Sequence, residues 1–203
     1  MKEEEVLGVL KRTGALITDD HVVYTSGKHG STYINKDMVF ANTSETSYLC
    51  HAIAKHFGND RIETVLGPAV GGAIMAQWIA RHLSTMNDRE VFSVYAEKRE
   101  DSFLIKRGYD KFIYQKRILV VEDILTTGRS AQKVSETAMD LGGKLIGLGA
   151  LFNRNKERPN SLSFIDKFFV LLSMELHAWE ESFCPLCKKG VPINNEVGKG
   201  DVL

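Results

Sequence analysis

The stretch RILVVEDILTTGRS, residues 117–130, decides the fold. Its four consecutive aliphatic residues do not alternate with polar ones, which is typical of a strand buried on both faces of a parallel sheet. Two carboxylates follow, Glu122 and Asp123, and then a hydroxyl-rich turn with one glycine, Gly128. Beyond the turn, apolar residues recur at spacings of three and four before a Gly-Gly pair, which predicts a helix. The stretch therefore predicts a strand, an acidic tip, a polar loop and a helix.

The acidic tip and the loop predict a ligand site. Ligands of open α/β sheets bind beyond the carboxyl ends of the strands, and a helix N-terminus suits a phosphate. The hydroxyls of Thr126, Thr127 and Ser130 add hydrogen bonds, and a glycine between them lets the backbone approach a ligand closely. Carboxylates would repel a phosphate, so we expect Glu122 and Asp123 to face sugar hydroxyls or a hard cation such as Mg²⁺. A phosphate, a ribose and a metal together describe a phosphoribosyl ligand.

Residues 120–130 resemble the phosphoribosyl pyrophosphate signature of type I phosphoribosyltransferases. The alternative is an ordinary buried strand with an acidic turn and a helix cap. That alternative explains the aliphatic run and the cap, but it leaves the acidic pair directly before a hydroxyl-rich glycine turn unexplained. The residues that the resemblance implies for the donor are Glu122, Asp123, Ile124, Leu125, Thr126, Thr127, Gly128, Arg129 and Ser130.

Composition limits the class of protein. The 203 residues and the 43% hydrophobic content fit one domain, residues 1–203, with one sizeable core. The resemblance implies that it is a phosphoribosyltransferase domain. Lys plus Arg and Asp plus Glu both number 26, which argues against binding to nucleic acid or to a membrane surface through bulk charge. No apolar run is long enough to span a membrane, and the N-terminus lacks an apolar signal core. Three cysteines are a poor disulfide framework, so we expect a cytoplasmic protein.

Strand and helix patterns alternate along the chain, which predicts an α/β fold with a mostly parallel central sheet flanked by helices. The resemblance adds a small hood of N- and C-terminal segments and a flexible lid loop. The lid is residues 97–116, a charged, hairpin-like excursion that shows no core face up to residue 110. Helices are expected at 3–13, 44–57 and 73–83, and strands at 21–24, 32–35, 62–66, 91–96, 144–152 and 164–172.

Further segments resemble orotate phosphoribosyltransferases. Residues 25–35 resemble the family's nucleobase segment, and residues 67–72 its pyrophosphate loop. Arg154 stands where the family carries an arginine for the orotate carboxylate, and residues 179–192 resemble the tail of one bacterial and archaeal branch. Each segment also has an ordinary interpretation: a hairpin turn, a tight strand-to-helix connection, a solvated charge.

The resemblance implies transfer of the phosphoribosyl group to orotate, giving orotidine 5′-monophosphate and pyrophosphate, by a homodimer whose lid is shared across subunits. Mg²⁺ is expected to bind through the substrate, with the acidic pair as candidate protein ligands. Two alternatives stay open: transfer to a purine or uracil, and a non-catalytic sensor of phosphoribosyl pyrophosphate. The implied residues are Lys98, Lys106 and Asp123 for catalysis, Lys98, Arg107 and Gly71 for the pyrophosphate, and Ser26, Lys28, Tyr33, Thr126 and Arg154 for orotate.

The chain departs from the family pattern at three places. Gly71 stands where many members carry a lysine, Glu97 where many carry an arginine, and Asn153 where an aspartate is usual. In the tail, Cys184 and Cys187 have the spacing of half a zinc site, but a structural site needs four ligands and His177 is the only histidine nearby in the sequence. The sequence favours a tight turn here, with a metal bound between subunits as the alternative.

Overall fold

The computed structural model describes residues 1–198 and contains one six-stranded sheet with the strand order β10-β9-β8-β5-β6-β7. Every neighbouring pair is parallel except β6 and β7, which are antiparallel. This confirms the predicted α/β fold with a mostly parallel sheet. The strands are β5 (Thr64–Pro68), β6 (Phe92–Arg99), β7 (Ser102–Leu104), β8 (Arg117–Leu125), β9 (Lys144–Asn153) and β10 (Lys167–Ser173).

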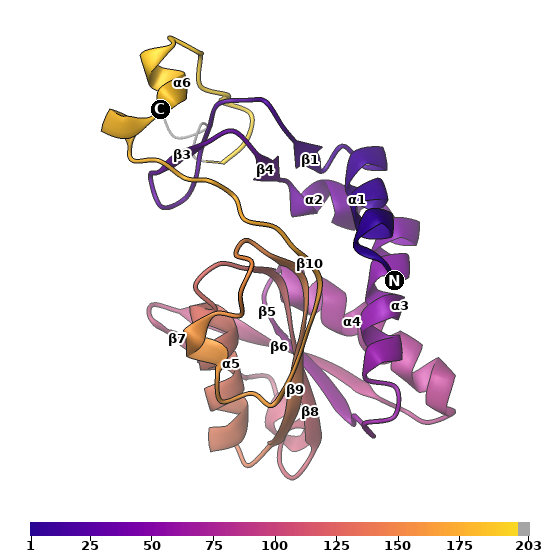
Figure 1. The fold of residues 1–203 in the computed structure, drawn as a ribbon. Coiled ribbons are helices and arrows are strands. Elements are labelled where there is room, and N and C mark those ends of the chain that lie inside the picture. The colour runs from indigo at the N-terminus through magenta and orange to yellow at the C-terminus, as the bar shows by residue number, and fades with distance from the viewer. Residues whose placement is uncertain (199–203) are drawn as a thin grey trace.

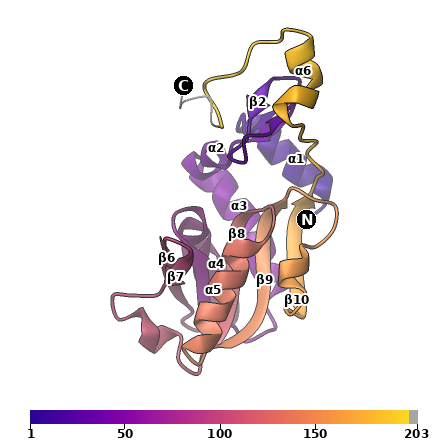
Figure 2. The same ribbon diagram turned by 90° about the vertical axis from the view of Figure 1, so that its left-hand side faces the viewer.

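Helices cover both faces of the sheet (Figures 1 and 2). On one face, Leu119 and Val121 of β8 join a core with α1 (Glu3–Arg12), α3 (Thr43–His56) and α4 (Gly71–Asn87). On the other face, Ile118 and Val120 join a second core with α5 (Arg129–Asp140). All four aliphatic residues are fully buried. This confirms the prediction that β8 shows no alternation of apolar and polar residues because both of its faces are buried.

A hood, residues 16–34 with residues 177–198, stands over one end of the sheet (Figure 1). Its N-terminal part holds two small antiparallel pairs. Its C-terminal part holds one short helix and returns to the N-terminal part through a bridge between His29 and Trp179. The hood elements are β1 (Leu16–Ile17), β2 (Val22–Val23), β3 (His29–Gly30), β4 (Tyr33–Ile34), the 3₁₀ turn Glu181–Phe183 and α6 (Pro185–Lys188).

Most expected elements are present within a few residues of their predicted bounds, and the structure adds the short strands β1 and β3. Helix α2 (Lys36–Ala41) was not expected, and the pyrophosphate loop is shorter than predicted because β5 extends to Pro68 and α4 begins at Gly71. The short connection contains a cis peptide bond between Ala69 and Val70. Within residues 1–198, no helix combines the length and the apolar character that crossing a bilayer requires.

The lid begins as the predicted hairpin, with Arg99 of β6 opposite Ser102 of β7. The expectation that it has no core face is wrong. Phe103 is 6% exposed and packs into the same core as α5, together with the fully buried Ile113. The segment is therefore anchored at Phe103 and at Ile113, with charged residues before the first anchor, at 97–101, and between the two anchors, at 106–107 and 110–111.

Candidate active site

A pocket of about 190 Å³ lies at the carboxyl ends of β5, β6 and β8, where the sequence predicted a ligand. Its walls come from α2, from the β5–α4 connection, from the start of the lid and from the acidic tip of β8. It brings together Lys36, Pro68, Ala69, Val70, Gly71, Lys98, Phe103, Glu122, Asp123 and Ser130.

Glu122 and Asp123 are buried at the centre of this site, with exposed fractions of 6% and 8%. The backbone N–H of Ile124 donates to Asp123 Oδ1 at 2.6 Å, and that of Asp123 donates to Glu122 Oε1 at 3.2 Å. Burial, followed by the charge of Asp123, raises the pKa of Glu122 well above its ordinary value. The chain thus holds a carboxyl group whose charged form is unfavourable until a ligand compensates for the burial.

Lys36 is the site residue that the sequence analysis missed. Its Nζ lies 2.8 Å from Asp123 Oδ2, from the first residue of α2. Burial lowers the pKa of Lys36, but the hydrogen bond to Asp123 and its charge outweigh that effect and raise it. Asn35 caps α2 by accepting from the N–H of Asp37 at 3.2 Å. This cap could have located the start of α2, but no local pattern pointed to a contact with Asp123.

Gly71 packs directly against the acidic pair. A Cβ atom at this position would lie 1.8 Å from Asp123 Oδ2, so the close approach requires glycine. This is the place where many members of the family that the sequence resembles carry a lysine. In this chain the carboxylate occupies the space of that side chain, and the ammonium group beside the carboxylate comes from Lys36 instead.

The loop of residues 126–130, which the sequence predicts to bind a phosphate, is held in place by hydrogen bonds from residues 155 and 161. Asn155 Nδ2 donates to the Thr126 carbonyl, and Ser161 Oγ donates to the Thr127 carbonyl, both at 2.7 Å. Gly128 begins α5 with a φ of 73°, and a Cβ atom there would lie 2.6 Å from Ser161 Oγ. The carbonyls of Thr126 and Thr127 therefore accept hydrogen bonds from the chain itself. The exposed threonine hydroxyls and the N–H groups at the start of α5 are the groups of this loop that can bind an anion.

Arg154 follows β9 and contacts the hood. Its guanidinium carbon lies 4.1 Å from the centre of the Tyr24 ring, a cation–π contact. The Tyr24 hydroxyl donates to the Thr32 carbonyl at 2.7 Å, and burial raises the pKa of Tyr24. Arg154 is therefore oriented at the junction between the sheet and the hood.

Of the other residues expected for orotate, Thr126 lies in the loop after β8, and Ser26, Lys28 and Tyr33 lie on the hood, outside the 190 Å³ pocket. Ser26 is exposed in the turn between β2 and β3, and Tyr33 is half-buried in β4. Lys28 Nζ pairs with Glu180 Oε1 at 3.0 Å, which links the two parts of the hood. The structure thus places Ser26, Lys28 and Tyr33 around the hood but does not bring them to the acidic pair.

The structure also shows where Asn153 and the charged residues of the lid lie. Asn153 is 2% exposed and donates to the Glu157 carbonyl at 2.8 Å, so this side chain stabilises the following loop. Lys98 lines the pocket of its own chain. Lys106 and Arg107 are exposed outside this pocket, and the Arg107 guanidinium lies 3.1 Å from Glu97 Oε1.

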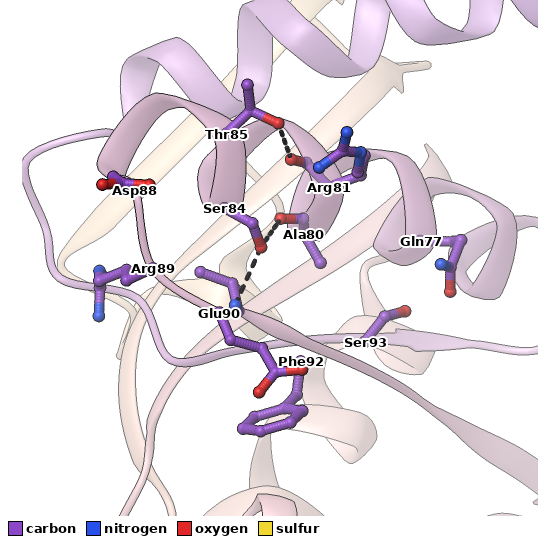
Figure 3. Close-up of a pocket in the computed structure, with 11 residues that line it drawn as sticks. Gln77, Ala80, Arg81, Ser84, Thr85, Asp88, Arg89, Glu90, Phe92 and Ser93 are labelled. Carbon is purple, nitrogen blue, oxygen red and sulfur yellow. Dashed lines mark hydrogen bonds between the residues drawn. The ribbon is translucent and has the colours of Figure 1, made fainter.

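A second, wider hollow of about 760 Å³ lies at the opposite end of the sheet, between the C-terminal half of α4 and the start of β6 (Figure 3). Three of its polar side chains, Ser84, Thr85 and Arg89, are hydrogen-bonded within the chain. Ser84 Oγ donates to the Ala80 carbonyl at 2.8 Å and accepts from the N–H of Val91 at 2.9 Å. This hollow is far from the carboxyl ends of the strands and from the acidic pair, so we do not assign the ligand to it.

Comparisons with known proteins agree with this geometry. A family model described as a phosphoribosyl transferase domain matches residues 37–182. An orotate phosphoribosyltransferase of Chlorobium phaeobacteroides is 34% identical over 194 residues, which cover 96% of this chain and 95% of the relative. One from Caldanaerobacter subterraneus is 32% identical and covers 95% of this chain and 96% of the relative.

Solved structures share the fold at lower identity. The crystal structure of orotate phosphoribosyltransferase from Aeropyrum pernix aligns with a TM-score of 0.69 at 22% identity, covering 91% of this chain and 98% of that one. The Mycobacterium tuberculosis enzyme in complex with 5-phospho-alpha-D-ribosyl 1-diphosphate aligns with a TM-score of 0.63 at 17% identity, covering 85% and 96%.

The raised pKa of Glu122 predicts that this residue destabilises the fold at neutral pH. A carboxyl group with a raised pKa in the folded state binds more protons when folded, so the free energy of unfolding falls as the pH rises above the ordinary value of 4.5. Glu122→Gln should therefore raise the free energy of unfolding above that of wild type at pH 8, and the gain should be smaller at pH 5. Urea unfolding at pH 5 and pH 8 measures the difference.

Glu63→Gln is the matched control. Burial raises the pKa of Glu63, but hydrogen bonds from the N–H of Arg117 and from Lys116 outweigh it and lower the pKa. Stability from a lowered pKa is present at pH 8 and is lost as the pH falls, so this variant should be less stable than wild type at pH 8. If Glu122→Gln is also less stable than wild type at pH 8, the prediction that ionised Glu122 destabilises the folded chain is wrong.

Proposed function

Since this chain belongs to the orotate phosphoribosyltransferase family, we propose that its pocket transfers the 5-phosphoribosyl group of phosphoribosyl pyrophosphate to orotate, giving orotidine 5′-monophosphate and pyrophosphate. The observation that carries the proposal is the pocket in which Lys36, Lys98, Glu122 and Asp123 meet at the carboxyl ends of the strands. The phosphate loop adjoins this pocket through Ser130. A ligand with a phosphate at one end, a ribose in the middle and a pyrophosphate at the other matches this order of groups.

Each part of the donor has a proposed place. The loop of residues 126–130 and the N-terminus of α5 bind the 5′-phosphate. Glu122 and Asp123 accept hydrogen bonds from the ribose hydroxyls. An ionised carboxylate has no donor of its own, so the hydroxyls supply the donors. The pyrophosphate lies between the start of α4 at Gly71 and the ammonium groups of Lys36 and Lys98.

Mg²⁺ fits the chemistry of this pocket, because buried carboxylate oxygens and phosphate oxygens are the hard donors that the ion prefers. Glu122 and Asp123 would hold it, directly or through the ribose hydroxyls of the substrate. When bound, the ion neutralises charge on the pyrophosphate. Lys36 keeps one oxygen of Asp123 at 2.8 Å, so the ion has the remaining carboxylate oxygens of the pair available.

The reaction is a displacement at the anomeric carbon with oxocarbenium character, and its main requirement is the position of the two substrates. Orotate is already an anion at neutral pH, so little proton transfer is needed. Arg154 binds the planar orotate carboxylate with its guanidinium group, held by the ring of Tyr24. Lys98 and Lys36 stabilise the leaving pyrophosphate, and the lid excludes water that would hydrolyse the donor.

The proposal includes the assembly of the protein. Residues 1–203 act as one domain, and two copies form a dimer in which the lid of each subunit reaches the site of the other. Lys106 and Arg107 support this arrangement, since both are exposed cations outside the pocket of their own chain. Lys98 serves its own site. The proposed compartment is the cytoplasm, where the three cysteines would stay free.

The first test of this function is neutralisation of the acidic pair. Orotate consumption with phosphoribosyl pyrophosphate and Mg²⁺ is followed by absorbance, beside uracil and hypoxanthine as competing bases. Glu122→Gln with Asp123→Asn should lower kcat/KM for orotate at least ~10²-fold, about 2.7 kcal/mol of transition-state stabilisation. Glu136→Gln with Asp140→Asn, two exposed acids on α5, is the control and should leave kcat/KM unchanged. Activity within about threefold of wild type in the first variant would refute the assignment.

Arg154 tests the choice of base. Arg154→Ala should raise KM for orotate far more than KM for the donor, because it removes a charge-assisted bidentate contact that contributes about 2–4 kcal/mol. Arg154→Lys keeps the charge but not the planar fork, so it should recover little. Lys156→Ala removes a nearby exposed cation that pairs with Glu175, and both KM values should stay as in wild type. Equal changes in both KM values for Arg154→Ala would show that Arg154 only stabilises the junction with the hood.

Subunit mixing tests the shared lid. One variant is Lys106→Ala with Arg107→Ala, which leaves Lys98 in place, and the other is the acidic-pair variant. Each alone should be nearly inactive. In a mixed dimer one site combines an intact acidic pair with an intact lid from the partner, so random exchange at equal concentrations should restore about a quarter of wild-type activity.

The result is interpretable once mass spectrometry shows that the subunits have exchanged. A lid that serves its own site would give no recovery, because neither chain of a mixed dimer then carries a complete site. Absence of recovery would therefore refute the shared lid while leaving the proposed reaction in place.

A further inference from the structure

Four metal-binding side chains meet inside the hood, away from the proposed active site. They are His21, His29, Cys184 and Cys187, and their ligand atoms all lie within 4.8 Å of one another. His21 directly precedes β2 and His29 lies in β3, while the two cysteines bracket the first turn of α6. The sequence analysis favoured a tight turn at the cysteines, with a metal bound between subunits as the alternative. His177, the histidine nearest to them in sequence, is exposed outside the cluster.

The distances between these atoms approach those of a tetrahedral zinc site. His21 Nε2 lies 3.6 Å from the Sγ atoms of both cysteines, and His29 Nδ1 lies 3.3 Å from Cys187 Sγ. Tetrahedral Zn²⁺ with ordinary Zn–N and Zn–S bonds separates N from S by about 3.5 Å and N from N by about 3.3 Å. The two ring nitrogens are 2.8 Å apart, so a small rotation of the imidazoles, about half an ångström at the nitrogens, completes the geometry.

The surroundings of the cluster suit a metal ligand set. His21 Nδ1 lies 2.7 Å from the Val191 carbonyl, which orients the ring and leaves Nε2 directed at the cluster. Cys184 is fully buried, and His21 and His29 are 1% and 4% exposed. Both cysteines are free thiols. Two nitrogens and two sulfurs that converge on one point are the donor set of structural zinc, and an Fe–S cluster would typically require more thiolates.

We propose that His21, His29, Cys184 and Cys187 of one chain bind a single structural Zn²⁺ ion that joins the two parts of the hood. All four ligands come from the same subunit, so no second copy is required for the site. The four protein ligands close the tetrahedron and leave no open position, which makes the ion structural.

The hood needs such a link because its own apolar core is small. Its buried hydrophobic residues are Val22, Tyr24 and Val197, with Ile17 and Tyr33 packed beside them. Further links join its two parts. Backbone bonds of 2.8 Å run in both directions between His29 and Trp179, and the N–H of Asn194 donates to the His21 carbonyl at 2.7 Å. The Asn194 side chain donates to Asp20 Oδ2, and the exposed Lys28 pairs with Glu180. Small units with so little core are commonly stabilised by a metal or a disulfide.

The ion would also order the proposed orotate side of the active site. Tyr24, which packs on Arg154, lies between the two histidine ligands in the chain, and Ser26 and Lys28 lie in the turn between them. This consequence rests on the proposed function, whereas the metal site does not. Loss of the ion should therefore raise KM for orotate more than KM for the donor, whose groups lie on the sheet.

The test is the metal content of the full chain, purified without metal-affinity chromatography under reducing conditions. Elemental analysis should find one zinc ion per chain, since one set of four ligands holds one ion. Replacement by Co²⁺ should produce the intense visible bands of a tetrahedral ion together with thiolate-to-cobalt charge transfer. A strong chelator should remove the metal and open residues 16–34 and 177–198 to proteolysis, and added Zn²⁺ should restore protection.

Matched variants locate the ion. Cys187→Ser and His29→Asn should each lose nearly all of the zinc and the cobalt spectrum. Cys50→Ala, which removes the cysteine buried in the sheet core, and His177→Asn, which removes the exposed neighbouring histidine, should retain both. If Cys187→Ser does not fold, the metal content and the cobalt spectrum of the wild-type chain still decide the question.

Two results would overturn the proposal. One is a wild-type chain that contains no zinc as purified and, fully reduced, takes up neither Zn²⁺ nor Co²⁺. The other is a Cys184–Cys187 disulfide in the purified chain, which would show that the pair stabilises the hood by a covalent link. A zinc-containing chain that proves inactive on orotate would leave the metal site standing and refute only the proposed function.

Discussion

The burial of two adjacent carboxylates at the end of β8 is the constraint on which the rest of the site depends. Glu122 and Asp123 lie where the sheet, two helices and the lid meet, and taking their charge out of water is unfavourable. The compensation is partial. Asp123 has Lys36 and the N–H of Ile124, whereas Glu122 has one backbone N–H and a raised pKa. The charged form of Glu122 is therefore unfavourable in this environment, and hydroxyl donors of a ligand would stabilise it.

Several features of the fold follow from accommodating this pair. The start of α4 must be glycine where it meets Asp123, because the carboxylate fills the space of a side chain. Helix α2 must begin where it does so that its first side chain reaches Asp123. Val39 anchors α2 in the sheet core, and the segment that leads into α2 comes from the hood. A small apolar core and a cluster of two histidines and two cysteines hold it, far from the chemistry but coupled to it through the backbone.

Local patterns carried most of the fold. The unbroken aliphatic run of β8 predicted a strand buried on both faces, and the two cores on either side of the sheet explain it. The hydroxyl-rich turn and the helical spacing after it predicted the loop that follows β8 and helix α5. These features succeed because strands and helices have short periods, so a dozen residues contain the whole signal. The prediction was wrong in the lid. The many charged residues there suggested a solvated segment, but Phe103 and Ile113 are buried and anchor it.

By itself the sequence determined strand β8, the acidic tip and the hydroxyl-rich loop at its end, and the family that these residues resemble. Only the tertiary structure decided which distant side chains complete each site. Lys36 reaches Asp123 because α2 packs across the end of the sheet, and His21 meets Cys184 across 163 residues because the C-terminal segment folds back on the N-terminal hairpin. Such contacts leave no period in the sequence, because they depend on the packing of whole elements and not on the spacing of residues within one element.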